Sequence, residues 1–350
     1  MFQLGFDKEE NNITQNMDIN DNFYMDLAVD EAWKYQGLTY PNPAVGGLIL
    51  NNFGKIISIS AHKKAGDSHS EVLTIQKAYF EITGDRDILD LSKSAEIHNY
   101  LYLNHNNIFK NFTIYTTLEP CNHYGKTPPC SLLIQKLGFK KVVIGVLDSN
   151  KDAEGGKEFL NTVGIETKVL NSENSINLIE PFLLWNKNRF IFFKYAQTVN
   201  GNISDGIISS KESRKFVHQI RDKIDLMVIG GNTVRVDKPT LDSRLIDGKA
   251  PDILIFSNQN NFDQNIPLFS VPNRRITVSN SLNIMKKHRY VMVEGGYSLL
   301  NAISKNIDWL LLFISPKVIS TTLTTIERLN FQIIYQQQVG TDLMVWLKKI

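Results

Sequence analysis

The residues of this 350-residue chain best suited to chemistry are its two cysteines, Cys121 and Cys130, which are separated by eight residues. The apolar run 112–115 before them predicts a strand, and the segment after Pro129 has helical spacing. Proline suits a helix start, where its missing N–H is not needed. Because a helix N-terminus favours the thiolate form of cysteine, the two thiols are well placed to bind a metal ion.

The upstream sequence His69-Ser70-Glu71 supplies the other groups that metal-assisted hydrolysis requires. A His-x-Glu followed by Pro-Cys and a second cysteine is typical of zinc-dependent nucleobase deaminases. Three-coordinate zinc lowers the pKa of a bound water to about 7. The candidate ligands are His69, Cys121 and Cys130, and Glu71 is the candidate shuttle that moves a proton from the water to the leaving amine. Each motif alone has an ordinary structural explanation, whereas their combination favours a metal site.

The composition of the chain argues against several classes of protein. The length suggests two or three domains, and a formal net charge of +2 predicts neither a nucleic-acid partner nor a membrane surface. Two cysteines make no disulfide framework, and a thiolate–zinc site fits a reducing cytosol, so we expect a cytoplasmic protein. No run approaches about 18 apolar residues. The first 21 residues are polar and rich in asparagine, which predicts a loose tail rather than a signal peptide.

The elements expected to position the site begin with an amphipathic helix at 22–36, followed by strands at 48–50 and 55–60 and by a helix that starts near His69. A further strand is expected at 141–147. Between the first helix and strand, two prolines hold Asn42 in extended backbone. An amide can both donate and accept, which suits recognition of a heterocycle edge. The alternative is that Asn42 only shapes a turn.

Residues 81–111 form a polar insertion in this first half of the chain. Its histidines, His98 and His105, raise the idea of a second metal site. Loops tolerate insertions at little cost, and connecting segments usually run over the surface. We therefore expect a solvated excursion on a loop.

The second half of the chain shows alternating strand and helix patterns from residue 190 onward. This order predicts an α/β sheet whose strand-end loops form a pocket. The loops at 230–233 and 294–298 contain paired glycines, which allow backbone N–H groups to approach a phosphate. Neither loop matches Gly-x-Gly-x-x-Gly, so a standard Rossmann site is not indicated. The domain boundary is expected near 147, with 148–189 as the first part of the second domain.

Taken together, these motifs resemble the bifunctional pyrimidine deaminase/reductase family of riboflavin biosynthesis. The resemblance is carried by Pro-Asn-Pro-x-Val-Gly at 41–46, by His-x-Glu, and by the stretch 117–130, which reads Thr-Leu-Glu-Pro-Cys-x-His-x-Gly-Lys-Thr-Pro-Pro-Cys. Most other nucleobase deaminases have only two residues between their cysteines. The resemblance implies a cytidine-deaminase-like α/β/α domain at 22–147 and a dihydrofolate-reductase-like α/β domain at 148–350.

The resemblance also implies two reactions and their cofactors. Zinc would support hydrolytic deamination of a diaminopyrimidine carrying ribose 5-phosphate, with Asn42 and Lys126 on the substrate and His123 as a possible assistant. NADPH would then reduce the ribosyl side chain to ribityl. The implied substrate-binding residues of the reductase are Lys194, Arg221, Asp237, Leu241 and Arg244. The implied cofactor-binding residues are Thr198, Ser209, Thr233, Glu294, Gly295 and Gly296. Assembly of several copies of this chain into a homo-oligomer is compatible with the family resemblance.

Several departures from the family pattern leave alternatives open. Ser70 stands where alanine is usual, Asn200 and Lys238 replace aspartates, and the stretch 207–210 is shortened. Lys238 reverses a charge beside the expected reductase site, so one alternative is an active deaminase with a degenerate reductase half. A second is a deaminase of another base, nucleoside or tRNA. A third is a non-catalytic zinc-stabilised binding protein, which an open ligand set with a neighbouring glutamate argues against.

Overall fold

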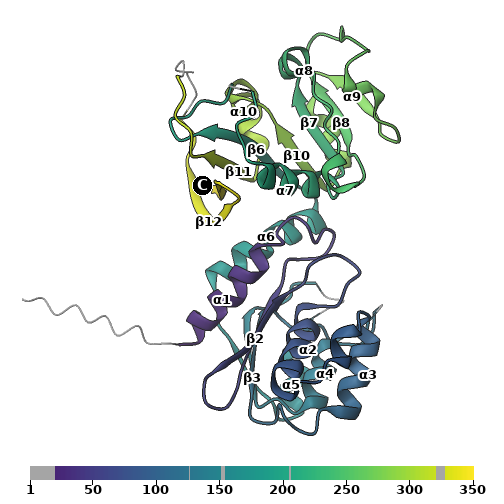
Figure 1. Ribbon diagram of the computed structural model, residues 1–350, viewed down its shortest axis with the longest axis vertical. Coiled ribbons are helices and arrows are strands. Elements are labelled where there is room, and N and C mark those ends of the chain that lie inside the picture. Colours follow the sequence, from purple (N-terminus) through teal and green to yellow (C-terminus); the bar gives the residue numbers. More distant parts are fainter. Residues whose placement is uncertain (1–19, 126, 151–153, 205, 321–327) are drawn as a thin grey trace, which may run out of the picture.

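The computed structural model describes residues 20–125, 127–150, 154–204, 206–320 and 328–350. Two α/β units lie one above the other in Figure 1, and helices α1 (Asp21–Trp33) and α6 (Glu173–Lys187) lie where they meet. Within the described residues, no helix combines the length and the apolar character needed to span a bilayer.

The first unit is built on a five-stranded sheet of order β2-β1-β3-β4-β5. Its strands are β1 (Gly46–Leu50), β2 (Ile56–Ala61), β3 (Thr113–Leu118), β4 (Lys141–Val146) and β5 (Glu166–Val169). β1 is antiparallel to β2 and β3, whereas β3, β4 and β5 are parallel. Successive side chains of a strand face opposite sides, and Leu48 and Leu50 pack with α1 and α6 while Ile49 packs on the other face.

The other face of this sheet is covered by α2 (Ser70–Thr83), α4 (Cys130–Leu137) and α5 (Gly156–Thr162), with α3 (Ser94–Asn104) beside α2 and α4 (Figure 1). A 3-10 turn, η1 (Asp87–Asp90), precedes α3. Helix α1 can approach β1 closely because Gly46 has no side chain: a Cβ there would lie 1.9 Å from the backbone oxygen of Ala28. The expected α/β/α layering of the first domain is confirmed.

The second unit is an eight-stranded sheet of order β12-β13-β11-β6-β10-β7-β8-β9. The central strands are parallel, and only β13 runs antiparallel to its neighbours β11 and β12. The strands are β6 (Phe190–Thr198), β7 (Leu226–Gly230), β8 (Asp252–Phe256), β9 (Ile276–Ser279), β10 (Tyr290–Glu294), β11 (Trp309–Ser315), β12 (Phe331–Val339) and β13 (Asp342–Lys349). The helices are α7 (Lys211–Arg221), α8 (Gly231–Asp237), α9 (Pro267–Ser270) and α10 (Tyr297–Ile303), with 3-10 turns η2 (Arg244–Ile246), η3 (Leu282–Lys287) and η4 (Ser304–Asn306).

The structure differs from the expected domain boundary. Strand β5 pairs with β4, with Ile144 opposite Val169, and α6 packs on β3 and β4. Strand β5 and helix α6 therefore complete the first unit instead of opening the second domain. Parallel neighbours such as β4 and β5 need a crossover connection, and α5 lies within it and packs on β5 and α4.

The expectation of a solvated loop at 81–111 is wrong. Residues 94–104 form α3, in which Ile97, His98 and Leu101 are fully buried. Ile97 and Leu101 are four residues apart, so they share one helix face and enter the core beside α2 and α4. The polar residues around them hid this short apolar stripe.

Aromatic side chains join the two units. Trp33 of α1 stacks on Trp309 and Tyr335 of the second sheet, with ring centroids 5.8 and 4.7 Å apart. Tyr40 packs on Tyr290, and its hydroxyl donates to the Asp225 carboxylate. Because these contacts belong to one continuous apolar cluster that spans both sheets, the relative orientation of the units is fixed by packing.

Replacement of Trp33, which is 1% exposed, is expected to weaken this junction. The variant Trp33→Ala should lose about 3–5 kcal/mol of unfolding free energy, because a buried tryptophan leaves a cavity. Denaturant unfolding followed by circular dichroism measures this, with Phe53→Ala as control because Phe53 is 86% exposed. An unchanged unfolding curve for Trp33→Ala would contradict the described junction.

Candidate functional site

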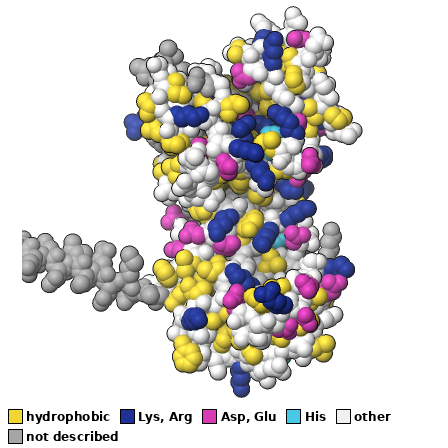
Figure 2. Space-filling view, viewed as in Figure 1, with side chains coloured by type: hydrophobic (Ala, Val, Ile, Leu, Met, Phe, Trp, Pro, Cys, Tyr) yellow, Lys and Arg dark blue, Asp and Glu magenta, His cyan; other side chains and the backbone are white. Residues whose placement is uncertain are grey.

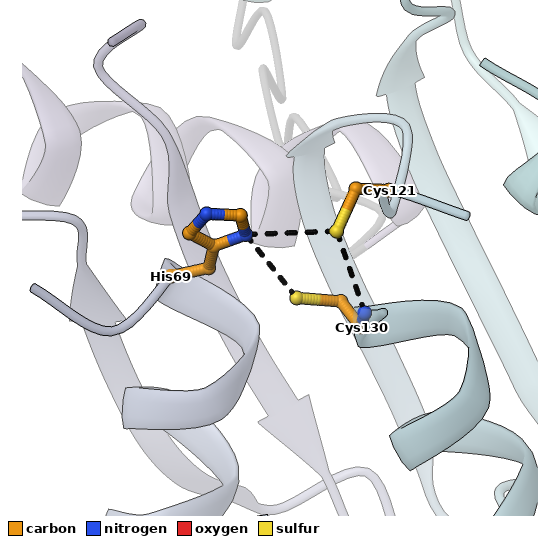
Figure 3. Close-up of side chains that lie close together, drawn as sticks. All are labelled: His69, Cys121 and Cys130. Carbon is orange, nitrogen blue, oxygen red and sulfur yellow. Dashed lines mark hydrogen bonds between the residues drawn. The ribbon is translucent and has the colours of Figure 1, made fainter. Parts of the chain in front are cut away.

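The candidate metal ligands meet where two helices begin beside the end of β3 (Figure 3). His69 immediately precedes α2, Cys130 is the first residue of α4, and Cys121 follows β3. His69 Nδ1 lies 3.6 Å from Cys121 Sγ and 3.5 Å from Cys130 Sγ. The backbone N–H of Cys130 donates to Cys121 Sγ over 3.4 Å. The structure thus brings together the three residues that the sequence predicted as ligands.

The donor set and its spacing fit zinc. The three ligand atoms all lie within 4.8 Å of one another. Ligands at zinc–sulfur and zinc–nitrogen distances of about 2.0–2.3 Å in tetrahedral geometry stand roughly 3.5 Å apart, as these do. One imidazole and two thiols leave a fourth position for water. A hydrogen bond from Cys130 lowers the pKa of the Cys121 thiol to about 4. Burial lowers the pKa of His69, but the hydrogen bond between His69 and Cys121 outweighs this and raises the value to about 9.

Glu71 lies in the first turn of α2, two residues after His69, and is 4% exposed. Burial raises the pKa of its carboxyl group, and the charge of His69 opposes this. The hydroxyl of Ser70 donates to Glu71 Oε2 over 2.9 Å. The serine at the position where alanine is usual therefore orients the candidate proton shuttle.

Asn42 is held by His62, whose role the sequence motifs did not indicate. Asn42 Nδ2 lies 3.1 Å from His62 Nε2, and His62 Nδ1 lies 3.1 Å from the backbone oxygen of Ser68. Since only Nδ1–H can donate to that carbonyl, Nε2 accepts from the amide of Asn42. The backbone N–H of Asn42 also donates to the backbone oxygen of Thr39, so Asn42 takes part in a turn as well. His62 directly follows β2, seven residues before His69, and that strand-end position was the signal available.

Two further candidate residues, His123 and Lys126, belong to the loop between the cysteines. His123 is exposed in the loop between the cysteines. Lys126 lies outside the described residues, so the structure does not place it. The first site is therefore described by its metal ligands, Glu71, and the pair formed by Asn42 and His62.

A second cluster forms around Glu294, the last residue of β10. Its carboxylate accepts from Lys194 Nζ over 2.9 Å and from Arg221 Nη2 over 2.8 Å. Burial raises the pKa of Glu294, but the two cations outweigh it and hold the value at about 2. The cluster brings together two expected substrate residues, Lys194 and Arg221. Glu294, which we expect beside the cofactor, also anchors both of these cations.

Other expected residues surround this cluster. Arg221 Nη1 donates to the backbone oxygen of Asp242, whose carboxylate pairs with Arg244. The charge of Glu294 acts on Asp237, whose pKa is raised mainly by burial. Leu241 has a φ of 56° in the intervening loop. His218 Nδ1 accepts from the backbone N–H of Leu245 and so supports this loop, a role that the sequence did not reveal.

The expected cofactor residues lie at the ends of strands β6, β7 and β10. Thr233 is in the first turn of α8, and Gly295 and Gly296 link β10 to α10. Thr198 is fully buried and its hydroxyl bonds Asn200, while Ser209 is half-buried just before α7. These side chains are spread over several loops and do not form one hydrogen-bonded cluster.

Lys238, which stands where the family usually has aspartate, lies at the surface. It ends α8 with a φ of 44° and is exposed. Its charge therefore projects into solvent more than into the cluster around Glu294.

From the three candidate ligands we predict how much zinc two single-residue variants will bind. Cys130→Ala should purify with little zinc, because one of three protein ligands is lost. His123→Ala, which alters an exposed histidine in the same loop, should keep one zinc per chain. Elemental analysis measures both. A full zinc equivalent in Cys130→Ala would exclude this ligand set.

Two family models match separate parts of this chain. The cytidine and deoxycytidylate deaminase zinc-binding region matches residues 18–146, and the RibD C-terminal domain matches residues 189–344. The riboflavin biosynthesis protein RibD of Aquifex aeolicus is 31% identical over 379 residues, which cover 94% of this chain and 98% of that protein. The protein of the same name from Synechocystis is 35% identical over 232 residues, covering 64% of this chain and 55% of its own length.

Two solved structures resemble this chain over nearly its whole length. A diaminohydroxyphosphoribosylaminopyrimidine deaminase/5-amino-6-(5-phosphoribosylamino)uracil reductase from Thermotoga maritima matches with a TM-score of 0.63 and 25% identity, covering 94% of this chain and 98% of that one. Acinetobacter baumannii RibD matches with a TM-score of 0.64 and 21% identity, covering 94% and 99%, which supports the fold.

Proposed function

This chain belongs to the RibD family of riboflavin biosynthesis proteins, and from that membership we propose how its residues divide two reactions between two sites. It is a bifunctional enzyme with deaminase and reductase activities, which use Zn²⁺ and NADPH. Its substrate is a small molecule, for which we propose the 5-phosphate of a diamino-ribosylamino-pyrimidinone. The observation that supports the deaminase assignment most strongly is the three-ligand cluster beside a buried glutamate.

For deamination, we assign the metal to His69, Cys121 and Cys130. When bound there, zinc supplies an activated water by lowering its pKa to about 7. Glu71 would take the two protons of the attacking water in turn, passing the first to the ring nitrogen and the second to the amine, which departs as ammonia. Burial raises the pKa of Glu71, which favours the protonated carboxyl that this exchange must form.

For substrate recognition in the deaminase, we assign Asn42 and Lys126, with His62 in support. His62 fixes the amide of Asn42 through Nδ2, which leaves Oδ1 to accept from an amino group of the pyrimidine. Lys126 would pair with the phosphate, as a flexible ammonium can. The alternative of another base or nucleoside would not use a phosphate partner.

For reduction, we assign the cluster around Glu294 to the ribosyl side chain. Glu294 orients Lys194 and Arg221, and Arg244 offers a partly exposed guanidinium that can bind the substrate phosphate bidentately. We also assign Asp237 and Leu241 to the binding of this substrate. NADPH supplies the hydride when bound, and its neighbours would be Thr198, Ser209, Thr233, Glu294, Gly295 and Gly296. The match to the reductase domain over residues 189–344 favours two activities over deamination alone.

The free cysteines and the net charge of the chain bear on its cellular location and its partners. We propose a cytoplasmic location, because free thiolate ligands persist in a reducing compartment. We propose no nucleic-acid or membrane partner, given the formal net charge of +2. Self-association through a sheet edge stays a prediction; β12 and β9 are the edges of the second sheet.

The proposed function is tested by a coupled assay on zinc-loaded protein with the diaminopyrimidine ribotide. Ammonia should be released with or without NADPH, and NADPH should be consumed only after deamination. Ammonia release without NADPH oxidation would leave only the deaminase. Absence of ammonia would refute the proposed substrate.

In the same assay, Glu71→Gln should lower the rate of ammonia release by roughly 10²–10⁴-fold, because the amide cannot shuttle protons. Its zinc content should match that of the unaltered enzyme, since Glu71 is not a ligand. Ser70→Ala, which removes only the hydroxyl that orients Glu71, serves as the milder comparison. Near-normal turnover by Glu71→Gln would refute the proton-shuttle assignment.

The variant Lys238→Asp restores the residue that the family usually has. We expect the rate of NADPH oxidation to change by less than about fivefold, because an exposed charge contributes at most about 1 kcal/mol. Steady-state measurement with the deaminated substrate tests this. A much larger gain would show that Lys238 limits the reductase of this chain.

A further inference from the structure

A polar hollow, here called the junction pocket, lies where the two units meet. Its volume of about 610 Å³ is within the range of roughly 300–1,000 Å³ that small-molecule sites occupy. The first unit contributes Tyr40, and the second contributes the segments 221–225, 249–252 and 287–289 together with Asn273. Of these residues, the proposed reactions use only Arg221. The pocket is therefore large enough for a ligand that those reactions do not account for.

The junction pocket has an excess of positive charge. Five Lys or Arg residues line it, against three carboxylates. Figure 2 shows Lys and Arg side chains near the meeting of the two units, around the place that α7 occupies in Figure 1. A hollow lined mainly by one sign of charge concentrates ions of the opposite sign. The cations are Arg221, Lys223, Lys249, Lys287 and Arg289, and the carboxylates are Asp222, Asp225 and Asp252.

Asp225 ties the pocket to the first unit. Its carboxylate accepts from the hydroxyl of Tyr40 over 3.2 Å and from the backbone N–H groups of Arg289 and Tyr290 over 2.9 and 3.0 Å. Tyr40 stands two residues before Asn42, which we assign to the pyrimidine. An occupant of the pocket would therefore contact the segment that carries a substrate residue of the deaminase.

The other two carboxylates of the pocket are also engaged. Asp222 pairs with the ammonium of Lys223 over 2.7 Å and accepts from the backbone N–H of Lys249 over 2.7 Å. Asp252 accepts from the backbone N–H of Arg275 over 2.8 Å and pairs with its guanidinium over 3.0 Å. All three negative charges of the pocket thus have donors within the chain.

Three cations of the pocket have no such partner. Within the part of the chain that the structure describes, Lys249, Lys287 and Arg289 form no ion pair, and all three are exposed. Like charges in one hollow repel each other, and an anion that enters the hollow relieves the repulsion. A phosphate group suits this set, because a guanidinium binds it bidentately and an ammonium binds it as a point charge.

The opposite wall of the pocket belongs to the reductase. Arg221 is 8% exposed, and its guanidinium donates to Glu294 and to the backbone oxygen of Asp242. It is one of the residues that we assign to the ribosyl side chain. The junction pocket therefore adjoins residues of both proposed sites.

We propose that the junction pocket binds the phosphate group of a small phosphorylated molecule, held by Lys249, Lys287 and Arg289. This ligand has two potential sources. One is the deaminated ribotide on its way from the first site to the second, and the other is a free phosphorylated metabolite that acts on Tyr40 and Arg221 from the pocket. The first source rests on the proposed function, whereas the binding itself does not.

The test compares two double variants of the full-length, zinc-loaded protein. The pocket variant, Lys249→Glu with Lys287→Glu, reverses two charges of the hollow. The control, Lys110→Glu with Lys136→Glu, makes the same change in net charge at two exposed lysines outside the pocket. Equilibrium dialysis with radiolabelled ribose 5-phosphate measures binding. The pocket variant should bind one equivalent fewer per chain than the unaltered protein, and the control should bind as much.

The coupled assay distinguishes the two sources. Free diffusion between the sites gives a lag before NADPH oxidation that equals the KM of the reductase half divided by its maximal rate, both measured with added intermediate. For a ligand in transit, the unaltered protein should show a lag roughly tenfold shorter than this value, and the pocket variant should show the full lag. For a free metabolite, ribose 5-phosphate should change the rate of one half-reaction at saturating substrate in the unaltered protein but not in the pocket variant.

Equal binding of ribose 5-phosphate by the unaltered protein and the pocket variant would overturn the proposal. A loss of binding that changes neither the lag nor either rate would also overturn it. Should the charge reversal prevent folding, Lys249→Gln with Lys287→Gln removes the same charges and must also lose the equivalent. Absence of ammonia release by the unaltered protein would refute the proposed deaminase, while the dialysis would still decide whether the pocket binds phosphate.

Discussion

The first site depends on how one buried carboxylate fixes the chain after β3. Glu119, which is 5% exposed, accepts from the backbone N–H groups of Asp148, Gly155 and Lys157 over 3.1, 3.2 and 2.9 Å. It thereby joins the segment that leads to Cys121 with the loop after β4 and the start of α5. A carboxylate that accepts several N–H groups is a rigid support, because each bond to a charged acceptor is strong. The thiol of Cys121 is consequently held where α2 and α4 deliver the other two ligands.

The second site also depends on a carboxylate at a strand end, but its hydrogen-bond donors are charged side chains. Glu294 lies at the end of a buried strand and holds two cations, Lys194 from the adjacent strand and Arg221 from α7. Buried ion pairs cost desolvation, and their value lies in fixing geometry more than in stability. In both units a buried acid at a strand end therefore orients the groups assigned to chemistry. The aromatic junction around Trp33 then fixes the two units relative to each other.

The grouping of the three candidate ligands was predictable because their residue types and motifs are distinctive. The residue types of His69, Cys121 and Cys130, with prolines before each cysteine, indicated both the ligands and the helix starts that position them. Most strands of the two sheets were also predictable from their apolar runs. β11 to β13 were not predicted, although the apolar run of β11 is a clear strand signal.

What the sequence could not reveal are features that depend on contacts between distant segments. The edge strand β5 has exposed and half-buried side chains, so its membership of the first sheet is visible only from its pairing with β4. His62 and Glu294 gain their roles from partners far along the chain, Asn42 and Lys194. α3 was hidden because only Ile97 and Leu101 mark its buried face within a polar insertion.

The central claim is that a three-ligand centre with one open position drives the first reaction. X-ray absorption spectroscopy of the zinc-loaded protein tests it most directly, because it counts the sulfur and the nitrogen or oxygen neighbours of the metal. A site with these three ligands and one water predicts two sulfur neighbours at about 2.3 Å and two nitrogen or oxygen neighbours at about 2.0–2.1 Å. The latter belong to one imidazole and one water, so Glu71→Gln should give the same spectrum. A different sulfur count, or a spectrum altered in Glu71→Gln, would contradict the account.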